Sequence, residues 1–255
     1  MTINDIERAL TIFRGIANRD KELATRFMHP TRYKQHNPHA SDGVAGVEEW
    51  IEQLPAEKHP LATARAFQDG PYVFAHTVGN VTRPAVFLDI FKFEDGLVVE
   101  HWVVWTDLAQ PNNSGHTQTD GPAVANDREK TESNKSLVRH FYQSVLIPGR
   151  YEKMSDFLLG DRFIRHDPHA EDGVEAFQRA LEKAAKRDKP LKVEEVKFVL
   201  GEGDFVLAAS QGSLAGEVYA FFDLYRIEND KLAEHWTVPM KVPPRSEWKN
   251  QNGIL

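Results

Sequence analysis

The order of hydrophobic patterns along the chain predicts helices followed by strands, and this order occurs twice. Apolar residues at helical spacing occupy residues 3–13, 23–27 and 44–54, and again 137–145, 151–158 and 174–181. Each helical series precedes four strand-like segments: 61–68, 72–78, 84–93 and 97–105 in the first half, and 191–200, 205–211, 218–227 and 231–238 in the second. Helices first and then a meander of strands favours an α+β fold, with the helices packed on one face of a curved antiparallel sheet.

Two sequence motifs recur in the same order, which indicates an internal duplication. Residues 36–44 reappear almost letter for letter 130 residues later, and residues 89–102 reappear 134 residues later. Between the copies, residues 109–134 are rich in Asn, Ser, Gly and Pro, as in a tail followed by a linker. We therefore predict two domains, 1–125 and 126–255, each long enough to bury its own core.

Composition narrows the classes of function. The chain has 255 residues, a formal net charge of −7 and no cysteine, so thiolate metal sites and a cysteine nucleophile are excluded. The acidic balance argues against nucleic acid as a partner, because such binding depends on Lys and Arg neutralising phosphates. No segment approaches the roughly 18–20 apolar residues that a membrane span needs. We expect a cytoplasmic protein without a membrane partner.

The last predicted hairpin of each half carries the clearest candidate chemistry. If the turn at residues 94–96 contains a bulge, Asp89 pairs with Val103 and Phe91 with His101, which places a carboxylate and an imidazole on one face. A two-residue turn would instead point His101 away. An Asp beside a His in an apolar pocket can hold the imidazole in one tautomer and make it a general base. The competing interpretation is that Asp89 and His101 form a hydrogen-bonded structural pair, or that both lie on an exposed face.

The repeated histidine loop has two interpretations. A proline separates two histidines in each copy, and such a rigid loop can aim an imidazole into a pocket. Alternatively, His36, His39, Asp42 and His101 form a metal set, because carboxylate and imidazole suit zinc or iron. We expect no metal, because His-x-x-His on a loop is not a specific ligand spacing, and Asp42 and Asp172 are placed to cap the following helices, with Glu175 in a capping box.

Both motifs resemble the SnoaL-like branch of the nuclear-transport-factor-2-like (NTF2-like) superfamily. Residues 33–43 resemble that branch's "Y-x-Q-H-N-P…D-G" segment, and residues 221–236 resemble its "F-D-x-F-R…E-H-W-D" hairpin. Residues 119–122 and 250–253 resemble its usual C-terminal tail. The resemblance implies two tandem cone-shaped α+β barrels around pockets. It also implies cyclase, isomerase, lyase or hydrolase chemistry without an organic cofactor, or ligand binding alone.

The chain departs from this family at one residue of each half. The family's acid/base aspartate after "E-H-W" is Val103 in the first copy and Thr237 in the second. Chemistry would then depend on the remaining carboxylates and the histidines. The predicted catalytic residues are Asp89, His101, His36, Asp223, His235 and His166, with His36 or His166 at a pocket mouth. The predicted ligand-binding residues are Tyr33, His39, Phe91, Trp105, His169, Tyr225 and Thr237.

Two functional hypotheses remain at this stage. The first is an acid–base enzyme acting on a small apolar, carbonyl-containing or otherwise activated substrate. The second is a non-catalytic small-molecule-binding protein whose halves pair as an internal pseudo-dimer through Trp102 and Trp236, which leaves room for further homodimerisation. Whether one pocket or both would work is open, because the copies differ at residues 91/225, 103/237 and 105/239.

Overall fold

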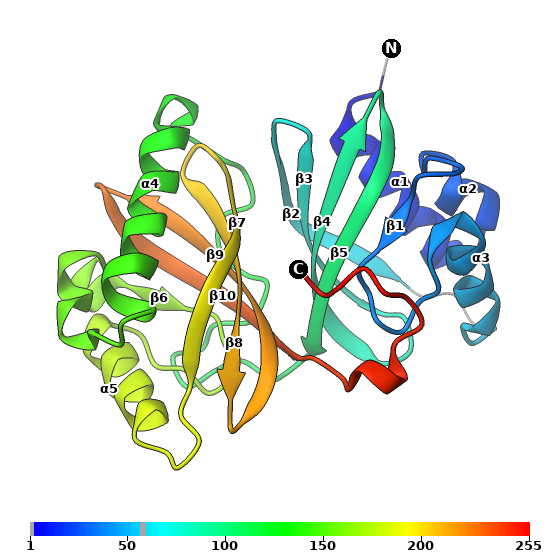
Figure 1. Cartoon of the computed structure of the whole chain (residues 1–255). Helices are drawn as coiled ribbons and strands as arrows, with labels where there is room; N and C mark the ends of the chain where they lie inside the picture. The colour runs from blue at the N-terminus through cyan, green and yellow to red at the C-terminus, as the bar shows by residue number, and fades with distance from the viewer. Residues whose placement is uncertain (1–2, 57–59) are drawn as a thin grey trace. The chain divides into compact units, whose positions relative to one another are not determined.

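The structure is a computed structural model that describes residues 3–56 and 60–255 (Figure 1). The chain divides into two compact units. The first unit combines the described residues up to Leu108 with Pro243–Ile254, and the second contains Ala109–Val242. The α+β fold class predicted from the sequence is confirmed, because each unit holds one five-stranded sheet and its own helices.

The helices of the first unit begin and end where local signals place them. Helix α1 (Asp5–Asn18) starts after Asn4, whose Oδ1 accepts a hydrogen bond from the backbone N–H of Glu7 at 2.9 Å. Helix α2 (Lys21–Thr25) is capped in the same way by Asp20. Helix α3 spans Gly43–Gln53. These are the three helices expected from the apolar spacing.

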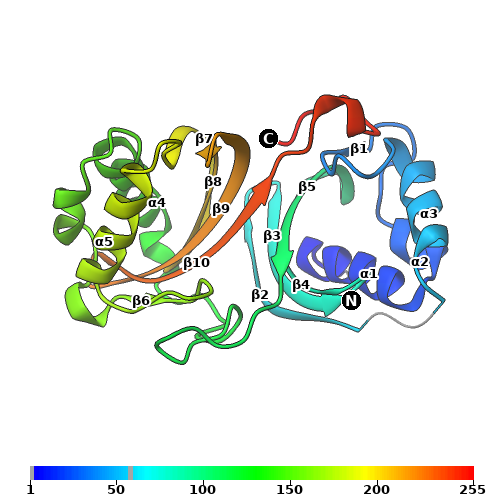
Figure 2. The ribbon, with the colours of Figure 1, turned by 90° about the horizontal axis from the view of Figure 1, so that it is seen from below.

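The first unit's sheet has the order β1-β5-β4-β3-β2. Its strands are β1 (Lys34–Gln35), β2 (Leu61–Asp69), β3 (Tyr72–Asn80), β4 (Pro84–Glu94) and β5 (Leu97–Asp107). All neighbours are antiparallel except the short β1, which runs parallel to β5. The sheet curves, and α1 lies in its hollow (Figure 2). Phe13 of α1 meets Phe91 of β4 there, with ring centroids 5.6 Å apart.

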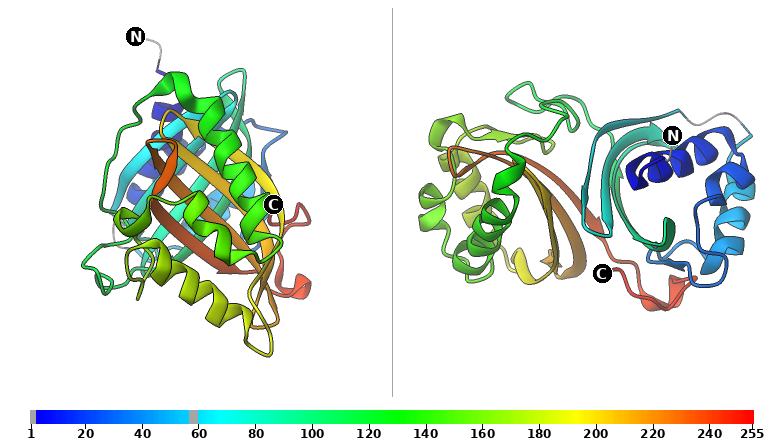
Figure 3. Two further views of the ribbon diagram at one scale, coloured as in Figure 1. Left: turned by 90° about the vertical axis from the view of Figure 1, so that its left-hand side faces the viewer. Right: turned by 90° about the horizontal axis from the view of Figure 1, so that it is seen from above.

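The second unit repeats this plan with changes in its helices. Its elements are η1 (Arg128–Lys130), α4 (Thr131–Phe141), η2 (Tyr142–Leu146), η3 (Tyr151–Asp156), η4 (Gly160–Arg162), β6 (Ile164–Arg165), α5 (Val174–Ala185), β7 (Lys192–Glu202), β8 (Phe205–Leu214), β9 (Glu217–Glu228) and β10 (Lys231–Lys241). A further short helix, η5 (Arg245–Glu247), lies in the segment that belongs to the first unit. Helices α4 and α5 cross the same face of the sheet (Figure 3, left). Among the described residues α4 passes directly into a π-helical turn, η2, which α1 lacks.

The two units do not divide the chain at residue 125, where the sequence analysis placed the boundary. Residues 109–122, here called the connecting segment, pack within the second unit. Pro243–Ile254, here called the terminal segment, packs within the first. The physical reason is side-chain hydrogen bonding: Asn112 Nδ2 donates to the carbonyl oxygen of Arg165 at 2.6 Å, and Asn250 Nδ2 donates to that of Asn37 at 2.7 Å. The connecting segment has the polar composition of a linker, because its side chains hydrogen-bond to backbone groups and do not fill a hydrophobic core.

The predicted helix caps at the histidine loops are confirmed only in the position of Asp42, which is the N-cap residue of α3, whereas the N-cap residue of α5 is Gly173 and not Asp172. Asp42 precedes α3, but its Oδ1 accepts a hydrogen bond from the backbone N–H of Gln35 at 2.9 Å and makes no capping bond among the described residues. Asp172 Oδ1 likewise accepts from the N–H of Arg165 at 3.0 Å, and Glu175 contacts Arg179 instead of closing a capping box. Each carboxylate thus ties its loop to the adjacent short strand.

In the part of the chain that the structure describes, none of the helices combines the length and apolar character needed to cross a membrane.

Candidate active site

The final hairpin of the first unit has the register that requires a bulge. Asp89 lies opposite Val103 and Phe91 opposite His101, and the pairing shifts between Lys92 and Phe93. The bulge resolves the ambiguity of the sequence analysis, because it sets Asp89 and His101 on the same face of the sheet. That face is the one covered by α1.

Between this face and the helices lies a cavity of about 300 Å³. Asp89 and His101 line it together with four of the predicted ligand-binding residues: Tyr33, His39, Phe91 and Trp105. Most of the remaining wall is apolar, including Ile12, Phe13 and Ile16 of α1. A hollow of this size with a few polar groups matches the usual character of a small-molecule site.

Asp89 and His101 form a hydrogen-bonded couple in the cavity wall. Nε2 of His101 lies 2.8 Å from Oδ1 of Asp89, and the imidazole stacks on Phe91 with ring centroids 4.4 Å apart. Burial raises the pKa of Asp89, and the hydrogen bond and charge of His101 oppose this rise. Oδ2 of Asp89 is buried and accepts no hydrogen bond from any residue within 3–56 and 60–255. An ionised Asp89 is therefore costly until a positive charge forms beside it.

The free nitrogen of His101 is the chemically available one. Nε2 is engaged by Asp89, which leaves Nδ1 with a lone pair when the imidazole is neutral. Nδ1 makes no hydrogen bond to the residues that the structure describes, and the His101 side chain keeps 14% of its surface exposed, at the cavity wall. The couple can thus take up a proton from a molecule in the cavity.

Tyr33 supplies a hydrogen-bond donor to the same cavity. Nε2 of Gln35 donates to the Tyr33 hydroxyl oxygen at 3.1 Å, and Oε1 of Gln35 accepts from the backbone N–H of Asn37 at 3.0 Å. Burial, followed by the charge of Asp89, raises the pKa of Tyr33, so the phenol keeps its proton. Gln35 was not identified from the sequence, because β1 (Lys34–Gln35) is too short to show which side chains share a face.

His36 does not lie at the cavity mouth, contrary to the sequence prediction. Side chains alternate along β1, so His36 points to the opposite face of the sheet from Gln35. There it stacks on Trp102 with centroids 4.5 Å apart, and its Nδ1 lies 3.1 Å from the carbonyl oxygen of Gly253. Burial lowers the pKa of His36, against the opposing effect of the Gly253 hydrogen bond. His36 and His101 therefore lie on opposite faces, and the metal set considered from the sequence is not assembled.

The second unit contains the same couple in a closed setting. His235 Nε2 lies 2.9 Å from Asp223 Oδ1, and the Tyr142 hydroxyl donates to Asp223 Oδ2 at 2.7 Å. Both carboxylate oxygens are thus occupied. Nδ1 of His235 is buried without a partner among the described residues, and the side chain keeps only 4% exposed.

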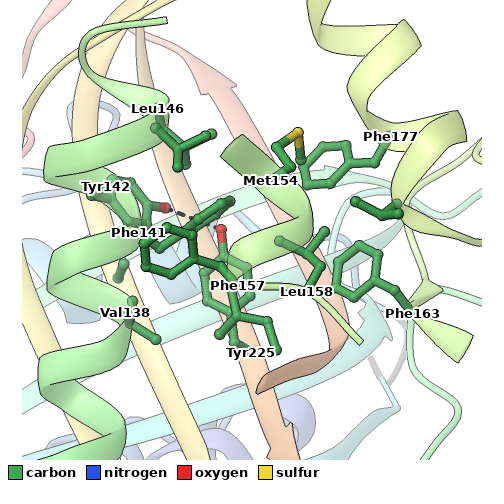
Figure 4. Close-up of a cluster of buried hydrophobic side chains, with 14 of the residues drawn as sticks. Val138, Phe141, Tyr142, Leu146, Met154, Phe157, Leu158, Phe163, Phe177 and Tyr225 are labelled. Carbon is green, nitrogen blue, oxygen red and sulfur yellow. Dashed lines mark hydrogen bonds between the residues drawn. The ribbon is translucent and has the colours of Figure 1, made fainter. Parts of the chain in front are cut away.

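A hydrophobic core surrounds this second couple. Tyr142, Phe141, Phe157 and Tyr225 pack between α4, η3 and the sheet (Figure 4), and the hydroxyls of Tyr142 and Tyr225 lie 3.5 Å apart. Tyr225, a predicted ligand-binding residue, is therefore part of the core, and burial raises its pKa well above the usual value. In the first unit, Ile12 and Phe13 of α1 line the cavity and do not bond Asp89 or His101. In the second unit, Tyr142 lies against the couple and bonds Asp223.

The other predicted residues of the second unit also differ in role. His166 stacks on Trp236, with centroids 4.3 Å apart, on the sheet face opposite Asp223, so the prediction of a pocket-mouth position is wrong for it as well. His169 is exposed on its loop, with φ +62°. Thr237 pairs with Asp223 across the hairpin. The counterparts of Tyr33 and Gln35 are Phe163 and Arg165, and Arg165 lies over the ring of Phe177 at 4.3 Å.

No family model and no curated protein matches the chain. Solved structures similar to it include two NTF2-like proteins. An NTF2-like protein of unknown function from Burkholderia xenovorans is 20% identical, covers 50% of this chain and 100% of its own, and has a TM-score of 0.39. One from Cytophaga hutchinsonii is 13% identical over 42% of this chain and 93% of its own, with a TM-score of 0.37. A protein from Kribbella flavida named as a candidate ketosteroid isomerase is 17% identical over 48% and 90%, with a TM-score of 0.37.

Asp89→Asn is expected to stabilise the protein at neutral pH. Burial raises the folded-state pKa of Asp89, so its favourable contribution to folding exists below the unfolded-state pKa and is lost as pH rises through the folded-state pKa. The neutral amide removes that loss. We expect the melting temperature to rise by about 2–4 °C at pH 7.5, as for a gain of ~1 kcal/mol, and to change less near pH 4. Calorimetry at both pH values measures this. A lower melting temperature of the variant at pH 7.5 would show that the buried charge of Asp89 does not destabilise the fold.

Proposed function

We propose that the first unit is an acid–base enzyme that transfers protons next to the carbonyl group of a small, largely apolar substrate. One observation carries the proposal: the Asp89–His101 couple lines an apolar cavity with one imidazole nitrogen available, whereas in the second unit the corresponding nitrogen of His235 is buried and Tyr142 occupies the other oxygen of Asp223. Placing a base and a hydrogen-bond donor in one apolar hollow is the arrangement that carbonyl-linked proton abstraction requires.

In this mechanism His101 is the base. Nδ1 removes a proton from the carbon adjacent to the carbonyl, and the electron pair of that C–H bond moves into the carbonyl group to give an enolate. Asp89 stabilises the imidazolium that forms, and its own buried charge is compensated at the same moment. The proton then returns from Nδ1 to carbon, at the same or a conjugated position. Proton and electron balance are preserved without a cofactor.

Tyr33 stabilises the negative oxygen of the enolate. Its hydroxyl oxygen is held by Gln35, and its retained proton is available to the substrate oxygen. Such a donor acts most strongly where charge develops in an apolar site. His39, whose ring meets Trp105 at 5.8 Å, lies at another part of the cavity wall and contacts substrate without transferring the proton.

We assign the chemistry to the first unit alone, and the second unit to a structural role. The second unit has Phe163 in place of Tyr33, so the donor hydroxyl is absent at that position. Its Asp223 is bonded by Tyr142, and its His235 is enclosed by the core.

Hydrogen–deuterium exchange tests the proposal without knowledge of the product. The protein is incubated in D₂O with cyclic ketones, among them cyclohexanone and β-tetralone, at a pH where spontaneous exchange is slow. Proton NMR then follows loss of the signals beside the carbonyl. Catalysed exchange supports the proposal. Ligand binding without exchange across the panel would instead support the binding-protein hypothesis.

Tyr33→Phe is expected to slow exchange by about 10²–10³-fold while leaving the protein folded. The change removes only the donor oxygen, and phenylalanine already occupies the equivalent position 163 in the second unit. Phe163→Tyr is the matched control, and we expect no change in rate. Equal rates for Tyr33→Phe and wild type would exclude Tyr33 as the donor to the substrate oxygen.

A further inference from the structure

A second cluster of chemically active side chains lies in the second unit, away from the Asp223–His235 couple. The connecting segment places His116 and Asp120 beside His166. Nδ1 of His166 lies 2.7 Å from Asp120 Oδ1, and Nδ1 of His116 lies 3.5 Å from Asp120 Oδ2. One donor atom of each of the three residues lies within 4.8 Å of the others.

The outer partners of both histidines are carboxylates. Nε2 of His116 lies 3.1 Å from Asp172 Oδ2, and Nε2 of His166 lies 3.1 Å from Glu234 Oε2. Metal-binding histidines characteristically donate the N–H of their second nitrogen to a carboxylate, which orients the ring and makes the coordinating nitrogen more basic. Here both rings have this partner on Nε2, and both Nδ1 atoms face the carboxylate of Asp120.

The local charge favours a cation. Three carboxylates surround the two imidazoles, and Arg226 compensates one of them, with its Nε 2.6 Å from Glu234 Oε1. The carbonyl oxygen of Thr117 also lies 3.1 Å from Nδ1 of His166. Both Nδ1 atoms thus face the carboxylate oxygens of Asp120, at 2.7 Å for His166 and 3.5 Å for His116, and this carboxylate is placed to coordinate the same ion.

We propose that His116, Asp120 and His166 bind one divalent transition-metal ion of the zinc class. Two nitrogens and one oxygen suit this class, with bonds of about 2.0–2.2 Å, and a fourth position remains for water. The ion takes the place of the proton that His166 Nδ1 now shares with Asp120 and Thr117. It fixes the connecting segment to the loop that carries His166 and Asp172, where Trp236 Nε1 already donates to the carbonyl oxygen of Asp120 at 3.1 Å. This role is structural and is independent of the proposed catalysis.

The duplication provides an internal control. With Gly121 aligned to Gly253, the counterparts of His116 and Asp120 are Trp248 and Asn252, and neither side chain binds zinc at neutral pH. His36, the counterpart of His166, contacts the carbonyl oxygen of Gly253. The proposal therefore predicts one ion per chain and not two.

The test uses the full chain, treated with EDTA and dialysed, and titrated with Zn²⁺ in a calorimeter at pH 7.5. We expect one equivalent to bind and the melting temperature to rise, because the ion binds the folded state. Co²⁺ in place of Zn²⁺ should give the visible absorption of a four- or five-coordinate site. Affinity should fall as pH falls, because protons compete for the imidazoles.

Variants separate this site from adventitious binding. His116→Ala and Asp120→Asn alter half-exposed side chains, so both should fold, and each should weaken Zn²⁺ binding by at least about 100-fold. His169→Ala removes an exposed histidine of the same loop and should leave the affinity unchanged. Absence of stoichiometric binding to wild type, two equivalents per chain, or full affinity in both site variants would overturn the proposal.

Discussion

His101→Ala is expected to reduce catalysed proton exchange by about 10²–10⁴-fold, the usual contribution of a positioned general base. His101 lines the cavity, and its Nδ1 is not engaged by Asp89, so this nitrogen can accept the substrate proton. Asp89→Asn should also reduce the exchange rate, because the amide does not stabilise the imidazolium. Exchange rates measured by NMR, with circular dichroism to verify folding, give the result.

The second unit provides matched controls for both changes. His235→Gln and Asp223→Asn alter the equivalent couple, in which the free imidazole nitrogen is buried and Tyr142 bonds the carboxylate. We expect both variants to melt at a lower temperature, because Asp223, unlike Asp89, has both carboxylate oxygens hydrogen-bonded, and to exchange protons at the wild-type rate. Equal losses from the two units would show that both couples act, and would refute the assignment of chemistry to the first.

The double variant Asn250→Ala/Asn252→Ala is expected to lose most activity although neither residue lines the cavity. Asn250 Nδ2 donates to the carbonyl oxygens of Asn37 and Ala40, and Asn252 Nδ2 donates to that of Gln35 and to Asp42 Oδ1. At about 1 kcal/mol per hydrogen bond, ~4 kcal/mol of support for this loop is lost. This loop follows β1 directly, and Gln35 at the end of β1 positions the Tyr33 hydroxyl. Melting temperature and exchange rate measure the two effects.

Asn112→Ala is the control for the terminal segment. Its Nδ2 donates to the carbonyl oxygens of Arg165 and Asp167, so it braces the corresponding loop of the second unit. We expect a lower melting temperature with unchanged exchange. If the Asn250→Ala/Asn252→Ala variant kept full activity while its melting temperature fell, the terminal segment would stabilise the fold without positioning the site.

Much of the fold and half of the site were predictable because both depend on local patterns. Period-two alternation and the Asp95–Gly96 turn located β4 and β5, and pairing rules gave the two candidate registers. The bulged register then placed Asp89 with His101. The resemblance to SnoaL-like proteins implied a pocket, and the cavity lies where the aromatic residues Phe91 and Trp105 indicated.

The rest depended on long-range contacts that one sequence does not display. The side of the sheet on which His36 lies is set by a two-residue strand, too short for its alternation to be evident. The placement of the terminal segment rests on hydrogen bonds between residues more than 200 positions apart. In the second unit Tyr142, 81 residues before Asp223, occupies the carboxylate. The Asp–His pair is repeated in both halves of the sequence, but this difference in its surroundings is not visible there.

If the first unit binds a ligand and the second does not, methyl signals from the two units respond differently in NMR. Met28 lines the cavity, and Met154 is buried in the second unit's core, so a protein labelled with ¹³C-methyl methionine reports on both. On titration with β-tetralone we predict a saturable shift of the Met28 signal and a constant Met154 signal. A saturable shift of Met154, or no shift of Met28 at saturating ketone, would contradict the account.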